Sequence, residues 1–148
     1  MDAEAELEGF IARFTDAVAT DIHAARAGMR ARLPGAVELV YDNYNALAIG
    51  YGPSERPSEL IFSIAAYPRW VSLFIVGGPR LDDPKRLLKG QGGVVRHIVL
   101  DTPARLADPD VEALMVQALA RAPKPLDPVQ PFRTVIKSVS ARQRPRRP

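Results

Sequence analysis

Three polar and aromatic segments in the middle of the chain carry side chains of the kinds that bind small molecules. Segment 41–45 is dense in hydrogen-bonding groups, segment 67–70 places an aromatic ring beside a guanidinium group, and an Arg-His pair follows the glycine-rich stretch 89–93. Such groups hydrogen-bond polar ligands and stack on planar ones. They predict a ligand-binding site composed of Tyr41, Asn43, Tyr44, Arg69, Trp70, Arg96 and His97. A purely local role in turns stays open, because Asx residues build turns and arginine stacks on aromatic rings.

The sequence offers little for catalysis. It has no cysteine, which excludes a thiolate nucleophile and thiolate metal ligands. Its only histidines, His23 and His97, have no metal-binding spacing, and no serine stands in a GxSxG motif. The stretch 89–93 lacks the strand before it and the helix after it that a dinucleotide fingerprint requires. We expect no catalytic residue, metal or cofactor, and enzymatic activity is only a last alternative.

Helices are predicted at both ends of the chain. Residues 4–33 are rich in Ala, Glu, Arg and Leu, and their apolar stripes predict two helices, the second capped by Thr15 and ended by a Pro-Gly pair. A capping aspartate and a proline precede the apolar stripe 111–119, which predicts a closing helix. A similar start predicts a short helix over residues 82–88.

Between these helices the pattern changes to short β-type segments separated by Gly, Pro and Asn. Strands are predicted near residues 38–41, 46–51, 60–65, 71–76 and 94–100. The third and fourth are apolar on both faces, so we expect them inside the sheet. The fold class is therefore α+β: a two-layer sandwich with an antiparallel sheet of about five strands and helices at the N- and C-terminal ends.

Charge and length suggest one domain, residues 1–140, followed by a disordered basic tail, residues 141–148. Residues 133–148 hold six of the twenty Lys and Arg residues and no acid, so the rest of the chain has 14 bases against 17 acids and is mildly acidic. The acidic N-terminus does not match a secretory signal, and no apolar run is long enough to span a bilayer. We expect a small soluble protein of the cytoplasm without a membrane partner.

Several segments, in order along most of the chain, together resemble the YdhG-like domain of unknown function. They are residues 7–11, 40–45, 67–74, 92–97 and 136–140. The resemblance implies a compact α+β fold with terminal helices around an antiparallel sheet. One branch of that family is described as frataxin-like iron chaperones, and for that role the match in this sequence is the acidic cluster of Glu4, Glu6 and Glu8.

The leading hypothesis is a non-catalytic binding or accessory module for an unknown small molecule or anion. One alternative is a frataxin-like iron-binding chaperone. Another is a weak nucleic-acid contact through the basic tail, where each neutralised phosphate adds salt-dependent affinity. Because the tail has no interleaved aromatic residues, nucleic acid is not the expected partner. A second copy of the chain, forming a homodimer, is a further possible partner.

Overall fold

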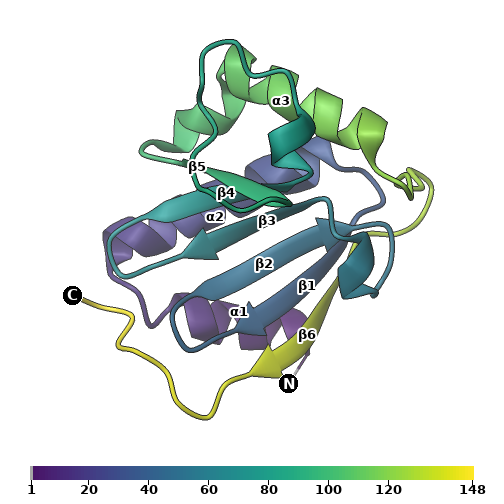
Figure 1. The fold of residues 1–148 in the computed structure, drawn as a ribbon. Helices are drawn as coiled ribbons and strands as arrows, with labels where there is room; N and C mark the ends of the chain where they lie inside the picture. The colour runs from purple at the N-terminus through teal and green to yellow at the C-terminus, as the bar shows by residue number, and fades with distance from the viewer. Residues whose placement is uncertain (1) are drawn as a thin grey trace.

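Two helices form the N-terminal part of the chain, as the sequence predicts. The structure, a computed structural model, describes residues 2–148. Helices α1 (Ala3–Ile11) and α2 (Asp16–Arg32) follow one another (Figure 1). The side chains of Asp2 and Thr15 accept hydrogen bonds from backbone amides of the first turns, which satisfies donors that a helix start leaves free.

Six strands form one sheet with the order β5-β4-β3-β2-β1-β6. Neighbouring strands are antiparallel except β1 and β6, which are parallel. The strands predicted to be internal, β3 and β4, lie inside the sheet. The α+β prediction is confirmed. The strands are β1 (Val37–Asp42), β2 (Leu47–Gly52), β3 (Phe62–Ala66), β4 (Val71–Val76), β5 (Val95–Val99) and β6 (Arg133–Val139).

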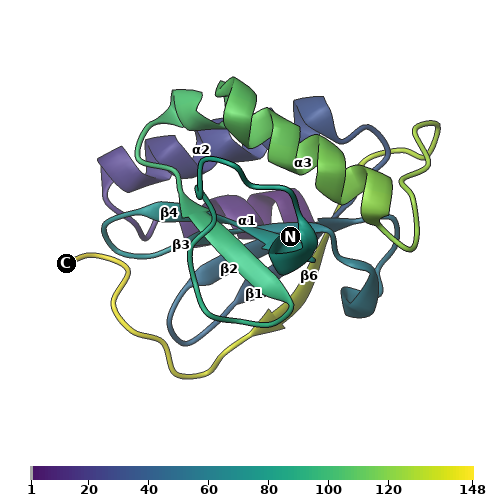
Figure 2. The ribbon, with the colours of Figure 1, turned by 45° about the horizontal axis from the view of Figure 1, so that its top comes forward.

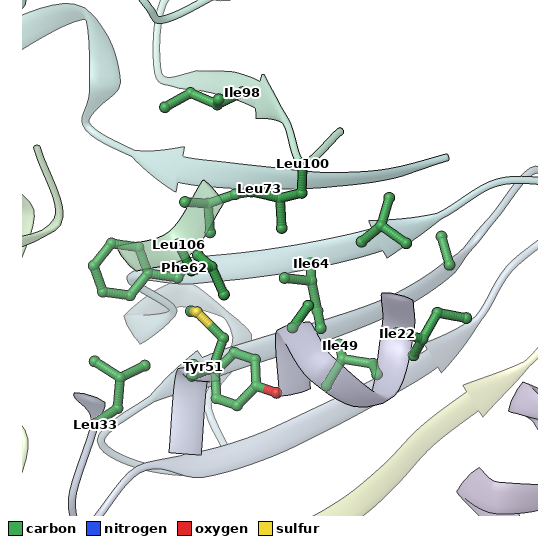
Figure 3. Close-up of a cluster of buried hydrophobic side chains, with 14 of the residues drawn as sticks. Ile22, Leu33, Ile49, Tyr51, Phe62, Ile64, Leu73, Ile98, Leu100 and Leu106 are labelled. Carbon is green, nitrogen blue, oxygen red and sulfur yellow. The ribbon is translucent and has the colours of Figure 1, made fainter. Parts of the chain in front are cut away.

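All three α-helices of residues 2–148 cover the same face of the sheet. Helix α3 (Pro109–Arg121) lies beside α2, and Figures 1 and 2 show the helical layer behind and above the strands. No helix among residues 2–148 combines the length and the apolar character needed to cross a bilayer. The core lies between the two layers, and Figure 3 shows part of it: Ile22, Leu33, Ile49, Tyr51, Phe62, Ile64, Leu73, Ile98, Leu100 and Leu106.

Two local predictions are wrong. The sheet has six strands rather than five, because β6 pairs with β1 from nearly a hundred residues away in the sequence. The predicted helix over residues 82–88 is absent. There the carboxylate of Asp83 accepts hydrogen bonds from the backbone amides of Leu87 and Leu88, which closes a turn instead of starting a helix. Short 3-10 helices occur elsewhere: η1 (Pro57–Glu59), η2 (Gly78–Arg80) and η3 (Pro103–Ala107).

The C-terminal segment 140–147 also differs from the prediction of a disordered tail. It lies along the end of β1, where the Nη2 atom of Arg146 donates to the Oδ1 atom of Asp42 at 2.8 Å and both side chains are only 1% exposed. The side-chain amide of Gln143 donates to the same carboxylate. A buried carboxylate requires such partners, so Asp42 supplies the physical reason for the ordered tail.

A buried ionic network joins the helical layer to the sheet. Arg26 of α2 donates through Nε and Nη2 to the carboxylate of Glu38 on β1 at 2.9 and 2.8 Å, and Glu38 is fully buried. The hydroxyls of Tyr51 and Thr134 donate to the same carboxylate. Burial, together with the charge of Glu38, raises the pKa of Tyr51 well above its ordinary value. Arg26 also donates to both carboxylate oxygens of Glu4, so the network connects α1, α2, β1, β2 and β6.

The Glu4 arm of this network predicts a pH dependence of stability. Hydrogen bonds from Arg26 hold the pKa of Glu4 below its ordinary value of 4.5. A lowered pKa in the folded state stabilises the protein above pH 4.5, and this stabilisation is lost as the pH falls through the lowered value. We expect Glu4→Gln to make the free energy of unfolding less dependent on pH below 4.5, measured by urea titrations across that range.

Glu6→Gln is the matched control, because Glu6 lies on the same helix and makes no ion pair within the described residues. It is expected to leave the acid dependence unchanged. An equal effect of both substitutions would show that the acid dependence comes from net charge and not from the contact with Arg26.

Candidate functional site

The face of the sheet opposite the helices carries small side chains at its centre. Strand residues alternate between faces, so cross-strand partners in register form rows on one face. One row on the uncovered face contains Tyr41, Ala48, Ala65 and Ser72. The adjacent row on that face contains Leu39, Gly50, Ser63, Phe74 and His97. The larger side chains therefore flank a floor of alanine, glycine and serine.

This floor forms a groove of about 630 Å³, which we call the open-face groove. Its volume falls within the range of sites that hold small organic ligands. Tyrosine and phenylalanine rings stand along it, and asparagine and serine side chains supply its polar groups. The lining residues are Asn43, Tyr44, Asn45, Ala46, Ala48, Leu60, Phe62, Ser63, Ala65, Tyr67, Phe74, Val76, Val95 and Ser140.

One wall of the open-face groove comes from the loop that contains η1. Leu60 of this loop packs directly over Gly50, since a Cβ atom at Gly50 would lie 2.8 Å from Leu60 Cδ1. A Cβ atom at Gly52 would come within 3.0 Å of the Glu59 carbonyl oxygen. The two glycines of β2 thus let the loop approach the sheet closely beside the groove.

The structure brings some of the predicted site residues to the open-face groove. Asn43 and Tyr44 line it, on the turn between β1 and β2. Tyr41 belongs to the row that forms its floor, and the Tyr41 hydroxyl is buried without a hydrogen-bond partner within residues 2–148. Burial also raises the pKa of Tyr41. The β1–β2 turn is therefore part of the candidate site, as the sequence suggests.

Two other predicted residues reach the groove through neighbouring rings. Trp70 stacks on Tyr67, with ring centroids 4.7 Å apart, and Tyr67 lines the groove. His97 packs against Phe74 at 5.2 Å, at the opposite side of the floor. Trp70 and His97 thus support the aromatic walls, and neither lines the groove directly.

The two predicted arginines do not line the open-face groove. Arg96 lies opposite Ile75, on the row that faces the helical layer, and its Nε atom donates to the Gly92 carbonyl. Arg69 is exposed on the turn between β3 and β4. None of the lining residues among residues 2–148 is charged. The segments that sequence reasoning grouped together therefore converge only in part.

Several lining residues were missed by sequence reasoning. Alanine, glycine and serine recur at every second position in Ala46-Leu-Ala48-Ile-Gly50 and in Ser63-Ile-Ala65, a period-two signal for one strand face made of small side chains. Ser140 comes from the C-terminal segment, which also places the Arg144 guanidinium 5.5 Å from the centre of the Tyr44 ring. No pattern of residue types in the tail predicts that it contributes to this site.

Two of the three glutamates in the acidic cluster suggested for iron, Glu4 and Glu8, are engaged in ion pairs. Both carboxylate oxygens of Glu4 accept hydrogen bonds from Arg26, and Glu8 lies 3.6 Å from the same guanidinium group and 3.5 Å from His23. Across residues 2–148 no group of three or more His, Asp or Glu side chains is arranged to hold a metal ion.

Comparisons of the chain with protein-family models, with curated proteins and with solved structures give no match. The resemblance to the YdhG-like family stays a prediction. Three properties of the open-face groove bear on function: its volume, its aromatic walls and its uncharged lining.

Proposed function

We propose that the protein is a non-catalytic binding module and that its open-face groove takes a flat, neutral aromatic small molecule. The observation that carries this proposal is a floor of small side chains bordered by aromatic rings on the uncovered face of the sheet. Sites for small molecules are mostly apolar concavities with a few polar groups that fix orientation. The open-face groove has this composition.

The shape of the floor favours a planar ligand. Ala48, Ser63 and Ala65 project little above the backbone, so a ring system can lie flat against the sheet. The rings of Tyr44 and Tyr67 then meet its edges or faces, and aromatic contacts of this kind add to the burial of apolar area. Asn43 and Asn45 can hydrogen-bond its polar substituents.

The uncharged lining favours a neutral ligand over an anion. Arg69 and Arg96, which made an anion plausible from the sequence, lie outside the lining residues. Transfer of an anion from water into a site without a cationic partner is costly. The Arg144 guanidinium lies over the Tyr44 ring at the edge of the groove, and Arg144 is not among the lining residues. Of the two ligand classes that the sequence suggests, a small molecule and an anion, the groove therefore favours a neutral small molecule.

A neutral fluorescent probe tests the proposal. Trp70 is the only tryptophan of the chain and stacks on a ring that lines the groove. We expect N-phenylnaphthylamine to quench Trp70 fluorescence saturably. Ala48→Leu, which fills the floor, is expected to weaken the binding by roughly tenfold or more, because the added side chain occupies the space of the probe. Fluorescence titration measures both dissociation constants.

Ala120→Leu is the control, since Ala120 is exposed on α3 on the helical side of the sheet. It adds the same atoms to the surface and should leave the affinity of the probe unchanged. Thermal unfolding of each variant shows that it is folded. Equal affinity of the Ala48→Leu variant and the unaltered protein, or no saturable quenching at all, would reject the open-face groove as the site.

A further inference from the structure

A second concavity lies at the C-terminal end of α3, on the other side of Leu60 and Val76 from the open-face groove. We call it the α3 pocket. Its volume is about 190 Å³, and it is enclosed by the end of α3, η2, the end of β4 and the loop before β5. Its lining residues are Leu60, Ile61, Val76, Gly77, Arg80, Leu81, Gly93, Val94, Ala118, Arg121, Ala122 and Pro123.

The wall of the α3 pocket is aliphatic except for two arginine side chains. Leu, Ile, Val, Ala and Pro side chains make up the rest, apart from two glycines, and no lining residue is acidic. Arg80 and Arg121 are exposed, and neither side chain forms an ion pair or hydrogen bond within residues 2–148. The pocket therefore combines an apolar interior with two positive charges that the protein leaves unbalanced.

Local roles explain only part of this arrangement. Arg121 stands in the last turn of α3, where a positive charge complements the helix dipole. Arg80 ends the three-residue η2, which is too short for a comparable effect. Secondary structure therefore does not explain why both arginines line the same aliphatic pocket.

We propose that the α3 pocket binds a small aliphatic monocarboxylate. Its hydrocarbon chain would lie among Leu81, Ala118 and their neighbours, where burial of each methylene removes apolar surface from water. Its carboxylate would pair with Arg80 and Arg121, since guanidinium groups match the two oxygens of a carboxylate. The volume, smaller than that of a typical drug-sized site, limits the ligand to a short chain. This site is independent of the open-face groove and of the function proposed for it.

Octanoate is the probe, with octanol as the uncharged analogue and acetate as the analogue without a chain. Isothermal titration calorimetry is expected to show saturable octanoate binding, with octanol and acetate each weaker by roughly tenfold or more. The double substitution Arg80→Gln and Arg121→Gln is expected to weaken octanoate by about the same factor and to leave octanol unchanged, because it removes the charge and keeps the apolar interior.

The matched control is the double substitution Arg69→Gln and Arg142→Gln, which removes the same charge from two exposed arginines outside the pocket. It should leave octanoate binding unchanged, and so should Ala48→Leu, which alters only the open-face groove. If both arginine double variants lost the same affinity for octanoate, the loss would come from net charge, and the proposal would be overturned. The absence of saturable octanoate binding, or its loss in the Ala48→Leu variant, would overturn it as well.

Discussion

Replacing Arg26 with methionine is expected to lower the free energy of unfolding by about 3–5 kcal/mol, the usual effect of removing one partner of a buried ion pair. The reason is the fully buried carboxylate of Glu38. It would keep the hydrogen bonds from the hydroxyls of Tyr51 and Thr134 but lose its cationic partner. Methionine is unbranched and helix-compatible, so the backbone of α2 need not change. Urea denaturation followed by circular dichroism measures the loss.

Arg32→Met on the same helix is the control. Arg32 pairs with Glu112 across partly exposed side chains, and such pairs contribute about 0–1 kcal/mol. The comparison separates a buried network from an arginine on the surface of the same helix. If both variants lose the same small amount, the Arg26 and Glu38 contact does not hold the two layers together in the way described.

Replacing Arg146 with methionine is expected to lower the free energy of unfolding by about 2 kcal/mol, which is the scale of hydrogen bonds to charged groups. The substitution removes the donor to Oδ1 of the buried Asp42 carboxylate, whose Oδ2 keeps Gln143 and Arg13, and it removes the donor to the Asn43 carbonyl. The effect is smaller than for Arg26 for two reasons. The Nε and Nη1 atoms of Arg146 are buried without partners, and the altered tail can leave the surface so that water reaches Asp42.

Release of the tail from the surface limits how much stability the Arg146→Met substitution can remove, and this limit can be measured. Deletion of residues 141–148 removes every tail contact, so the Arg146→Met variant cannot be much less stable than the deletion variant. Arg142→Met is the control in the same segment, because Arg142 is exposed and makes no ion pair within the described residues, and changes of this kind lie within about 0.5 kcal/mol. If neither Arg146→Met nor the deletion changes the urea midpoint, the tail does not dock as the structure places it.

Docking of the tail also affects the candidate site. The backbone amide of Arg144 donates to the Tyr44 carbonyl, and the Arg146 guanidinium donates to that of Asn43. Both acceptors belong to the β1–β2 turn, whose side chains line the open-face groove. The last residues of the chain therefore help to hold one end of the groove in place.

Local signals in the sequence were sufficient for most of the fold. Helical periodicity and capping residues predict α1, α2 and α3, and β-type segments between Gly, Pro and Asn predict five of the six strands within one or two residues at each end. The two-faced apolar character of residues 60–65 and 71–76 correctly predicts internal strands. These signals act over a few residues, where backbone geometry and side-chain alternation decide the outcome.

The candidate site was only partly predictable, because its parts come from distant segments. The β1–β2 turn and the ring of Trp70 could be identified from residue types, but not the burial of Asp42, which orders the tail, nor the register that aligns Ala48 with Ala65. Alternation along β5 already puts Arg96 and His97 on opposite faces, but only the tertiary structure shows that Arg96 is the one on the helical side. Hydrogen bonds between strands and the partners of buried charges depend on contacts across the chain, which residue types and spacing alone do not specify.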